Sequence, residues 1–400
     1  IMKGTGLKYF MTIKIAWSLF NQFPHHTFIW EGIDGSQVIT HMPPEGTYNS
    51  SIRPHALNNM AKDYIEKDDI PHALNLFGIG DGGGGPGYEH LECIQRTKNI
   101  KDLPKINMTT AASFFELLKS YKHKMNVYQG ELYLENHQGT LTSQANLKKA
   151  HRRMEQTLKT VEILLTSQGV YETYKTQLDD IWKEHLLYEF HDILPGSSIK
   201  RVYDECLSRY DVLFEMIETI LKETFQSYTS TPTHNSYPYN PNPFDVTHLE
   251  KINNVYVLYH IKPYSNECIQ KDMYAYETTL NNHSFQLKDY DITFDPSNGH
   301  ICRVTHVASQ TELLMEHSAN HLSVYKDLGD AWNILDHYRE QEAMTPTLTG
   351  QTIKKYGRFI EIQHRYEVMH STIDERVVID TMSNQITFKH DVDWQDVGYM

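Results

Sequence analysis

Three apolar stripes with helical spacing occupy the middle of the chain and constrain its fold more than any other feature. Apolar side chains recur every three or four residues over positions 150–165, 174–188 and 206–220. Such spacing places one apolar face along each helix. A Pro-Gly-Ser-Ser break at residues 195–198 separates the second helix from the third. Consecutive amphipathic helices bury their faces against one another, so the pattern predicts a compact three-helix bundle.

The sequence on either side of these helices has a different texture. Before them, short apolar strands alternate with Gly/Pro turns and helical stretches, which is typical of α/β structure. After them, residues 254–258 and 358–362 have the composition of strands, and residues 285–288 alternate apolar with polar side chains. Four prolines between these regions favour an extended linker. We therefore predict an α/β region at 1–140, a three-helix bundle at 141–227, a linker at 228–243 and an antiparallel β-sandwich at 244–400.

Composition excludes several classes of function. A net charge of -14 argues against nucleic-acid binding, which depends on clustered Lys and Arg. No apolar run approaches the roughly 18 residues that span a bilayer, so we expect no membrane insertion. The four cysteines lie far apart with no Cys-x-x-Cys pair, and residues 1–14 lack the features of a secretion signal. Together these observations predict a cytoplasmic protein whose ligand is neutral or needs a cation.

A glycine-rich loop at residues 78–86 follows an apolar run at 74–77 and precedes a predicted helix that begins at Tyr88. It matches G-x-G-x-x-G, the pattern of dinucleotide sites, which would make the protein an NAD-dependent oxidoreductase. Asp81 in the loop would repel a pyrophosphate, however. The alternatives are a solvated loop, or a permissive backbone that presents the Asp81 carboxylate to a substrate at the end of a strand.

A second motif, His191-Asp192, lies where the second predicted helix ends and a turn reverses the chain. Neutral imidazole is a common zinc ligand, and an adjacent carboxylate can orient a substrate beside the metal. A zinc site normally takes three or four protein ligands, so a buried histidine that caps the helix end is the alternative.

Two further segments are rich in groups that bind sugars. Residues 130–140 concentrate hydroxyl, carboxylate and imidazole groups and include Glu135, and residues 23–36 include Trp30 and Asp34. Such segments could line a sugar pocket, with Trp30 stacking on a sugar face. The alternatives are a solvated glutamate and a tryptophan in the core.

Taken together and in this order, the segments resemble glycoside hydrolase family 38, the α-mannosidases, particularly their bacterial and cytosolic branch. The resemblance covers residues 23–36, 76–92, 130–142 and 190–199, and the start of the β region at Asn240. It implies an α/β barrel-like catalytic domain, a three-helix bundle and C-terminal β domains. It also implies retaining hydrolysis of mannose-containing oligosaccharides or glycosides, assisted by one zinc ion.

The resemblance assigns expected roles to individual residues. It implies that His191 is a zinc ligand, that Asp192 contacts sugar hydroxyls and that Asp81 is the acid/base carboxylate. Further substrate contacts are expected from Trp30, Asp34 and Glu135. The family's His-x-Asp motif and nucleophilic aspartate have no counterpart here, so we expect an internal fragment without the N-terminal part of the catalytic domain, inactive alone.

Other functions stay open on the sequence. A non-catalytic carbohydrate-binding module would depend on the β region at 244–400 alone. The sequence does not decide the mannosidic linkage or the aglycone, and a homo-oligomer is compatible with it.

Overall fold

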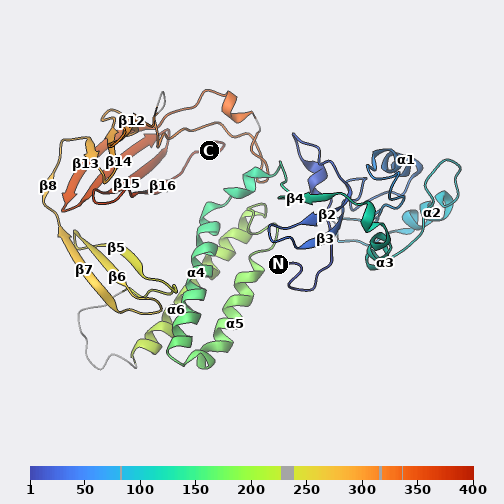
Figure 1. Cartoon of the computed structure of the whole chain (residues 1–400), viewed down its shortest axis with the longest axis horizontal. Helices are drawn as coiled ribbons and strands as arrows, with labels where there is room; N and C mark the ends of the chain where they lie inside the picture. Colours follow the sequence, from blue (N-terminus) through green and yellow to red (C-terminus); the bar gives the residue numbers. More distant parts are fainter. Residues whose placement is uncertain (82, 227–237, 315–317, 336) are drawn as a thin grey trace. The chain divides into compact units, whose positions relative to one another are not determined.

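The fold was analysed in a computed structural model that describes residues 1–81, 83–226, 238–314, 318–335 and 337–400. The chain divides into two compact units, residues 1–138 and residues 139–400 (Figure 1). Each unit has its own hydrophobic clusters, and each is described by itself below.

The first unit is built on a mixed four-stranded sheet with the order β1-β3-β2-β4. β2 and β3 form an antiparallel hairpin, whereas β1 pairs with β3, and β4 with β2, in parallel. The strands are β1 (Tyr9–Met11), β2 (Thr27–Glu31), β3 (Gln37–His41) and β4 (Val127–Gln129).

One helix, α3 (Ala111–Leu118), packs its apolar face on this sheet. Phe114, Phe115 and Leu118 of α3 are buried in one cluster with Ile29 and Ile39 of the sheet. The Thr110 side chain caps α3 by accepting the Ser113 N–H at 3.2 Å. The helices are α1 (Pro54–Asp63), α2 (Tyr88–Thr97) and α3 (Ala111–Leu118), with short 3-10 turns at Lys14–Trp17, Lys119–Lys124 and Gln138–Leu141.

A buried polar network crosses the hairpin of the first unit. The Leu74 N–H donates to Nε2 of His41 at 3.1 Å, so the imidazole proton is on Nδ1, which donates to the Thr27 hydroxyl at 2.9 Å. That hydroxyl in turn bonds to the Tyr64 hydroxyl at 2.7 Å. Burial lowers the pKa of His41 to about 3, so the ring is neutral.

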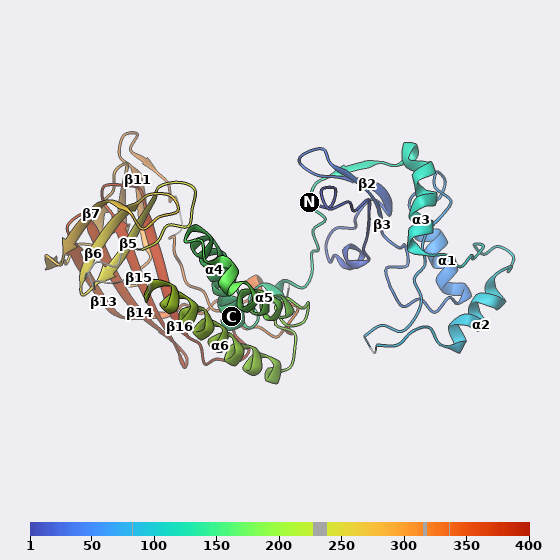
Figure 2. The same cartoon turned by 90° about the horizontal axis from the view of Figure 1, so that it is seen from below.

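The second unit begins with three helices that share one hydrophobic cluster, coloured green in Figures 1 and 2. They are α4 (Ala145–Ser167), α5 (Tyr171–Leu187) and α6 (Lys200–Gln226). Leu158, Ile181 and Tyr210, one from each helix, are almost completely buried. The three apolar stripes of the sequence lie largely on these helices, and their buried residues belong to this cluster.

Antiparallel sheets make up the rest of the second unit. The three-stranded sheet has the order β5-β6-β7, the five-stranded sheet β16-β15-β14-β13-β8, and the four-stranded sheet β12-β11-β10-β9. Their strands are β5 (Val246–Ile252), β6 (Val255–Ile261), β7 (Cys268–Ala275), β8 (Thr278–Thr279), β9 (Ser284–Gln286), β10 (Tyr290–Phe294), β11 (Ile301–His306), β12 (Thr311–Glu312), β13 (Thr347–Tyr356), β14 (Phe359–Val368), β15 (Ser371–Asp380) and β16 (Ile386–Asp393); a 3-10 turn spans Tyr338–Glu340.

The five-stranded sheet is covered on both faces. Val377 and Ile379 of β15 pack with the four-stranded sheet, whereas Val378 between them packs with Tyr256 of the three-stranded sheet. Successive strand residues point to opposite faces, so an unbroken apolar run is what a doubly covered strand requires.

Sequence expectations for strands and linker have mixed outcomes. Residues 254–258 and 358–362 fall largely within β6 and β14, which confirms both strands. Most of the predicted linker at 228–243, namely residues 228–237, lies outside the described residues. The apolar run at 74–77 forms no strand longer than one bridge: Phe77 makes an isolated parallel bridge with Ser50, and the Leu74 N–H donates to the His41 side chain. Across the described residues, no helix is long and apolar enough to cross a membrane.

Candidate active site

Asp81 lies at the exposed tip of the glycine loop. A bridge between Ile79 and Gly84 closes the loop, and Asp81 adopts a left-handed conformation with φ of 56°. Asp tolerates this region better than most residues. A Cβ at Gly80 would lie 2.5 Å from the Asn49 side-chain oxygen, so a larger residue here would require that side chain to move. The loop follows a single bridge and not a strand of the sheet, so it lacks the strand–loop–helix context of a dinucleotide site.

Trp30 and Asp34 belong to the β2–β3 hairpin. The Trp30 indole N–H donates to the Gly130 carbonyl at 2.8 Å, and its ring lies 5.2 Å from that of Phe10. Asp34 accepts the Ser36 N–H at 2.9 Å and the Ser36 hydroxyl at 3.0 Å, and these bonds hold its pKa below the ordinary value. Both side chains therefore have structural partners within the first unit.

Glu135 ties two segments of the first unit together. Its carboxylate accepts the backbone N–H of Asn21 at 2.6 Å and also the Asn21 side-chain amide. These bonds lower the pKa of Glu135. Asn21 also lines a cavity of about 410 Å³ together with Phe23, His25 and Met42. Through these hydrogen bonds, Glu135 holds one of the residues that line this cavity.

His191 and Asp192 lie in the turn that follows α5. The His191 side chain is 80% exposed, with Nε2 3.5 Å from Oδ2 of Asp192. Oδ1 of Asp192 accepts the Ser197 hydroxyl at 2.8 Å, and the Asp192 carbonyl accepts the Ser198 hydroxyl at 2.8 Å. The exposure of His191 makes the buried helix-cap interpretation wrong. The Asp192 carboxylate is held by the Ser197 hydroxyl, whereas the His191 imidazole is exposed to solvent.

These two side chains fit part of a zinc shell. Imidazole nitrogen and carboxylate oxygen are both zinc donors, and they lie close enough to approach one ion after small side-chain rotations. In the described part of the chain, three metal-ligating side chains come close together elsewhere, at His151, His185 and Glu189. Sequence analysis missed that group. The spacing of four between His185 and Glu189 was its only local signal, because His151 comes from another helix.

The predicted residues are divided between the two units. Asp81, Trp30, Asp34 and Glu135 belong to the first unit, on the glycine loop, the hairpin and the segment after β4, whereas His191 and Asp192 belong to the second. Within the first unit, hydrogen bonds join Trp30 of the hairpin to Gly130, and Asn21 to Glu135.

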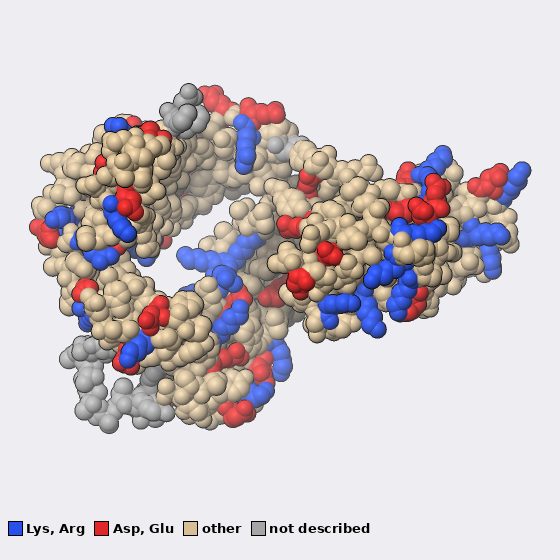
Figure 3. Space-filling view, in the orientation of Figure 1, with Lys and Arg blue, Asp and Glu red and all other residues tan. Residues whose placement is uncertain are grey.

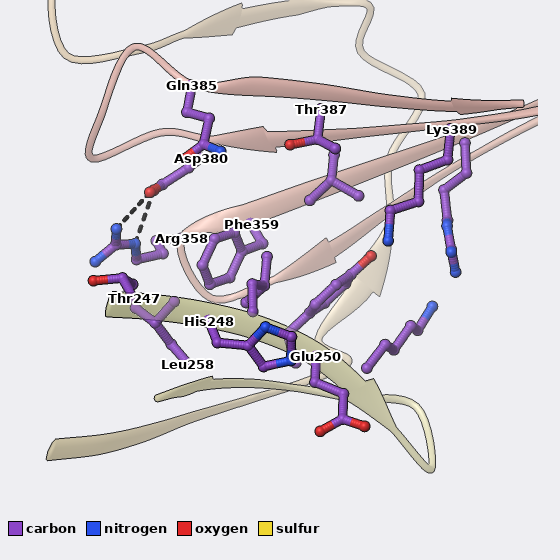
Figure 4. Close-up of a pocket in the computed structure, with 15 residues that line it drawn as sticks. Thr247, His248, Glu250, Leu258, Arg358, Phe359, Asp380, Gln385, Thr387 and Lys389 are labelled. Carbon is purple, nitrogen blue, oxygen red and sulfur yellow. Dashed lines mark hydrogen bonds and ion pairs between the residues drawn. The ribbon is translucent and has the colours of Figure 1, made fainter. Parts of the chain in front are cut away.

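A separate cavity of about 550 Å³ opens between the three-stranded and five-stranded sheets (Figure 4). Arg358 donates to Asp380 at its edge, with Nε 2.8 Å from Oδ1, and the Phe359 ring forms part of its wall. None of the six predicted site residues lines it. On the face shown in Figure 3, basic and acidic side chains are interspersed.

Comparison with known proteins places the chain in context. Three family descriptions match it in order: "Glycosyl hydrolases family 38 N-terminal domain" at residues 1–131, "Alpha mannosidase middle domain" at 135–227, and "Glycosyl hydrolases family 38 C-terminal domain" at 287–399.

Similar curated proteins carry related names. Alpha-mannosidase G of Dictyostelium discoideum is 38% identical over 233 residues, which is 58% of this chain and 21% of that protein. Alpha-mannosidase 2C1 of Homo sapiens is 36% identical over 225 residues, 55% of this chain and 22% of that protein. Alpha-mannosidase of Saccharomyces cerevisiae is 36% identical over 55% of this chain and 21% of its own length. The chain thus spans about a fifth of the length of these relatives.

Proposed function

The chain belongs to glycoside hydrolase family 38, and from this premise we propose that its residues form part of a retaining α-mannosidase assisted by zinc. The observation that carries the proposal is the exposed His191–Asp192 pair, which lies inside the segment matched by the α-mannosidase middle domain. The names of the similar proteins support a mannose-containing oligosaccharide or glycoside as substrate.

The domain organisation is part of this proposal. We propose that residues 1–140 are the C-terminal part of an α/β barrel-like catalytic domain, supported by the mixed sheet and the helix α3 packed on it. Residues 141–227 would be the three-helix middle domain, supported by the shared core of α4, α5 and α6. Residues 228–243 would be the linker, and residues 244–400 a β-sandwich domain, supported by the core between two sheets.

Zinc bound at His191 would hold sugar hydroxyls and stabilise the charge that develops as the glycosidic bond breaks. Nε2 of His191 is the proposed ligand atom. Asp192, oriented by the Ser197 hydroxyl, would accept hydrogen bonds from the sugar hydroxyls beside the metal. Trp30, Asp34 and Glu135 are retained as proposed sugar contacts, supported only by the resemblance of their segments to the family.

Asp81 is the proposed general acid/base. Retaining hydrolysis pairs such a carboxyl group with a nucleophilic carboxylate roughly 5 Å away. Asp81 would give its proton to the leaving oxygen and later take one from the attacking water. We propose that these 400 residues are inactive alone, since they supply only one of the family's expected zinc ligands.

The cytoplasm is the proposed compartment. Support comes from the four cysteines, which are all unpaired, because free thiols persist in reducing surroundings.

The His191→Ala variant of the full-length enzyme tests the zinc assignment. The catalytic zinc and mannosidase activity are expected to be lost together, because the ion loses an imidazole ligand. Zinc content, turnover and circular dichroism should be measured side by side. His123→Ala, which removes another exposed imidazole, is the control and should keep both. A folded His191→Ala enzyme with unchanged zinc content and activity would show that His191 is not a ligand.

A further inference from the structure

A cluster of three metal-ligand side chains joins two helices of the second unit. His151 projects from α4, His185 from the last turn of α5, and Glu189 follows one turn later. One ligand atom from each lies within 4.8 Å of the other two. Nε2 of His151 is 3.2 Å from Oε1 of Glu189, and the two imidazole rings are stacked with centroids 4.4 Å apart.

One buried nitrogen of this cluster, Nε2 of His185, lacks a hydrogen-bond partner among the described residues. His185 is completely buried, and its Nδ1 lies 3.2 Å from the Tyr210 hydroxyl. Its Nε2 is also buried, and no described residue forms a hydrogen bond with it. Buried polar atoms are rarely left unpaired, since they lose their bonds to water on folding. Burial and the neighbouring His151 lower the pKa of His185.

We propose that His151, His185 and Glu189 bind one divalent metal ion of the zinc type. In this arrangement His185 donates its Nδ1 proton to the Tyr210 oxygen, which leaves the lone pair on Nε2 directed at the ion. A hydrogen bond from the other ring nitrogen is the usual support of a metal-bound histidine. Burial raises the pKa of Tyr210, so its hydroxyl stays protonated and does not add a second anionic charge.

The ligand set favours zinc over magnesium or calcium. Two imidazole nitrogens and one carboxylate oxygen are typical of zinc, whereas magnesium and calcium prefer oxygen ligands alone. Zinc–ligand bonds of about 2.1 Å place tetrahedral ligand atoms about 3.4 Å apart, so no pair of these atoms, all within 4.8 Å of one another, needs to close by more than roughly 1.4 Å. The Glu189 side chain, 44% exposed in the turn after α5, has room to move. Water would complete the shell.

This site is separate in its residues from the one proposed at His191. The ion would fasten α4 to the end of α5, two positions before His191 in the sequence. Its role is therefore structural, and its loss need not abolish catalysis.

Metal titration of the full-length enzyme tests the proposal. After chelator treatment, zinc binding is measured in competition with a coloured chelator, and cobalt binding by its visible absorption. Wild-type enzyme is expected to bind one equivalent that Glu189→Gln and His151→Asn weaken by roughly 10- to 100-fold or more. His191→Ala should keep this equivalent, and Glu172→Gln, an exposed carboxylate on α5, should behave as wild type.

Three outcomes would overturn the proposal. Glu189→Gln and His151→Asn could bind zinc as tightly as wild type. Wild type could bind a single equivalent that disappears only with His191→Ala, which would leave the proposed function standing. Finally, the cluster could bind no zinc or cobalt at all, and a water molecule would then satisfy His185. Both cluster variants alter side chains that reach the surface, and circular dichroism verifies that they fold.

Discussion

At the scale of single residues, His41 illustrates how packing fixes a protonation state. The ring receives the Leu74 N–H and gives its own proton to Thr27, so a second proton would have no acceptor and no contact with water. A charged imidazole is therefore excluded from the folded first unit at neutral pH.

The first prediction is that the first unit loses stability as the pH falls from 7 toward 5. The pKa of His41 is about 3 when folded and near 6.5 when unfolded, so the unfolded chain binds more protons between these values. Stability is full above pH 6.5 and declines below it, by about 1.4 kcal/mol per pH unit. Urea unfolding at several pH values measures this dependence. His41→Gln cannot titrate, and an unchanged pH dependence in that variant would assign the effect to other groups.

The second prediction concerns Asp81 in the full-length enzyme. Asp81→Asn should lower turnover of mannosides with poor leaving groups by about 10²- to 10⁴-fold, because they need a proton from the general acid. Substrates with activated aryl leaving groups should lose far less. Asp102→Asn changes another exposed aspartate with positive φ and should have no effect. Equal losses on both substrate types would indicate that Asp81 only shapes its loop.

The role of a residue could be predicted from the sequence only where the residues that share it are adjacent in the chain. His191 and Asp192 are adjacent, so their motif is visible in the sequence. The group formed by His151 and His185 depends on how α4 packs beside α5, and no local pattern encodes that contact. Likewise, Glu135 looked like a solvated turn residue, and only the fold brings Asn21 to it.

At the scale of elements, the helices of the second unit depend on their buried stripes. Leu158 of α4 is completely buried in the cluster shared with α5 and α6. We predict that Leu158→Ala lowers the free energy of unfolding by about 2–5 kcal/mol, through lost burial and the cavity left behind. Leu187→Ala, at a position 63% exposed, should change it by less than about 0.5 kcal/mol. Denaturant unfolding followed by circular dichroism distinguishes them, and equal effects would contradict the shared core.

A buried ion pair connects two sheets of the second unit. Glu361 of β14 is completely buried and accepts two bonds from the Lys251 ammonium of β5, at 2.7 and 2.8 Å, and one from the Tyr256 hydroxyl. We predict that Glu361→Ala destabilises the protein by about 3–5 kcal/mol, because Lys251 is left without its partner. Thermal and denaturant unfolding measure the loss.

The double variant Glu361→Gln/Lys251→Met tests how much of the stability loss comes from the unpaired Lys251 charge and how much from lost packing. It removes both charges and should recover much of the lost stability. As a surface comparison, Arg365→Ala breaks an exposed pair with Asp374 and should cost about 1 kcal/mol or less. If Glu361→Ala were as mild as Arg365→Ala, the pair would not contribute to holding the sheets together.

The elements themselves differ in how far sequence reveals them. α4, α5 and α6 were predictable because a helix forms from contacts three and four residues apart. The order of strands in the sheets was not predictable, since β8 pairs with β13 through Thr278 and Lys355, which are 77 positions apart in the sequence. The apolar run before the glycine loop forms only a single bridge, between Phe77 and Ser50, and its Leu74 N–H donates to the His41 side chain.

At the scale of the whole molecule, the succession of structural textures was predictable and the pairing between distant segments was not. The α/β, helical and β regions follow one another as the composition indicated, and the three family domains match in the same order. Domain boundaries stay predictions. Membership of a family came from several motifs in sequence, because each motif alone had a structural alternative.

Because β15 is covered on both faces, its register with the neighbouring strands must be selected by something other than hydrophobicity. Where one face of a strand is solvated, a slip of one residue exposes the apolar side chains and is rejected. The run Val377, Val378 and Ile379 is apolar in either alignment, so hydrophobicity carries little information about it. Discrimination then falls to polar partners, the bond of His364 to Glu375 at 2.8 Å and the paired bonds of Arg358 to Asp380. These polar pairs can form in only one alignment of the strands, so they select the register of the sheet.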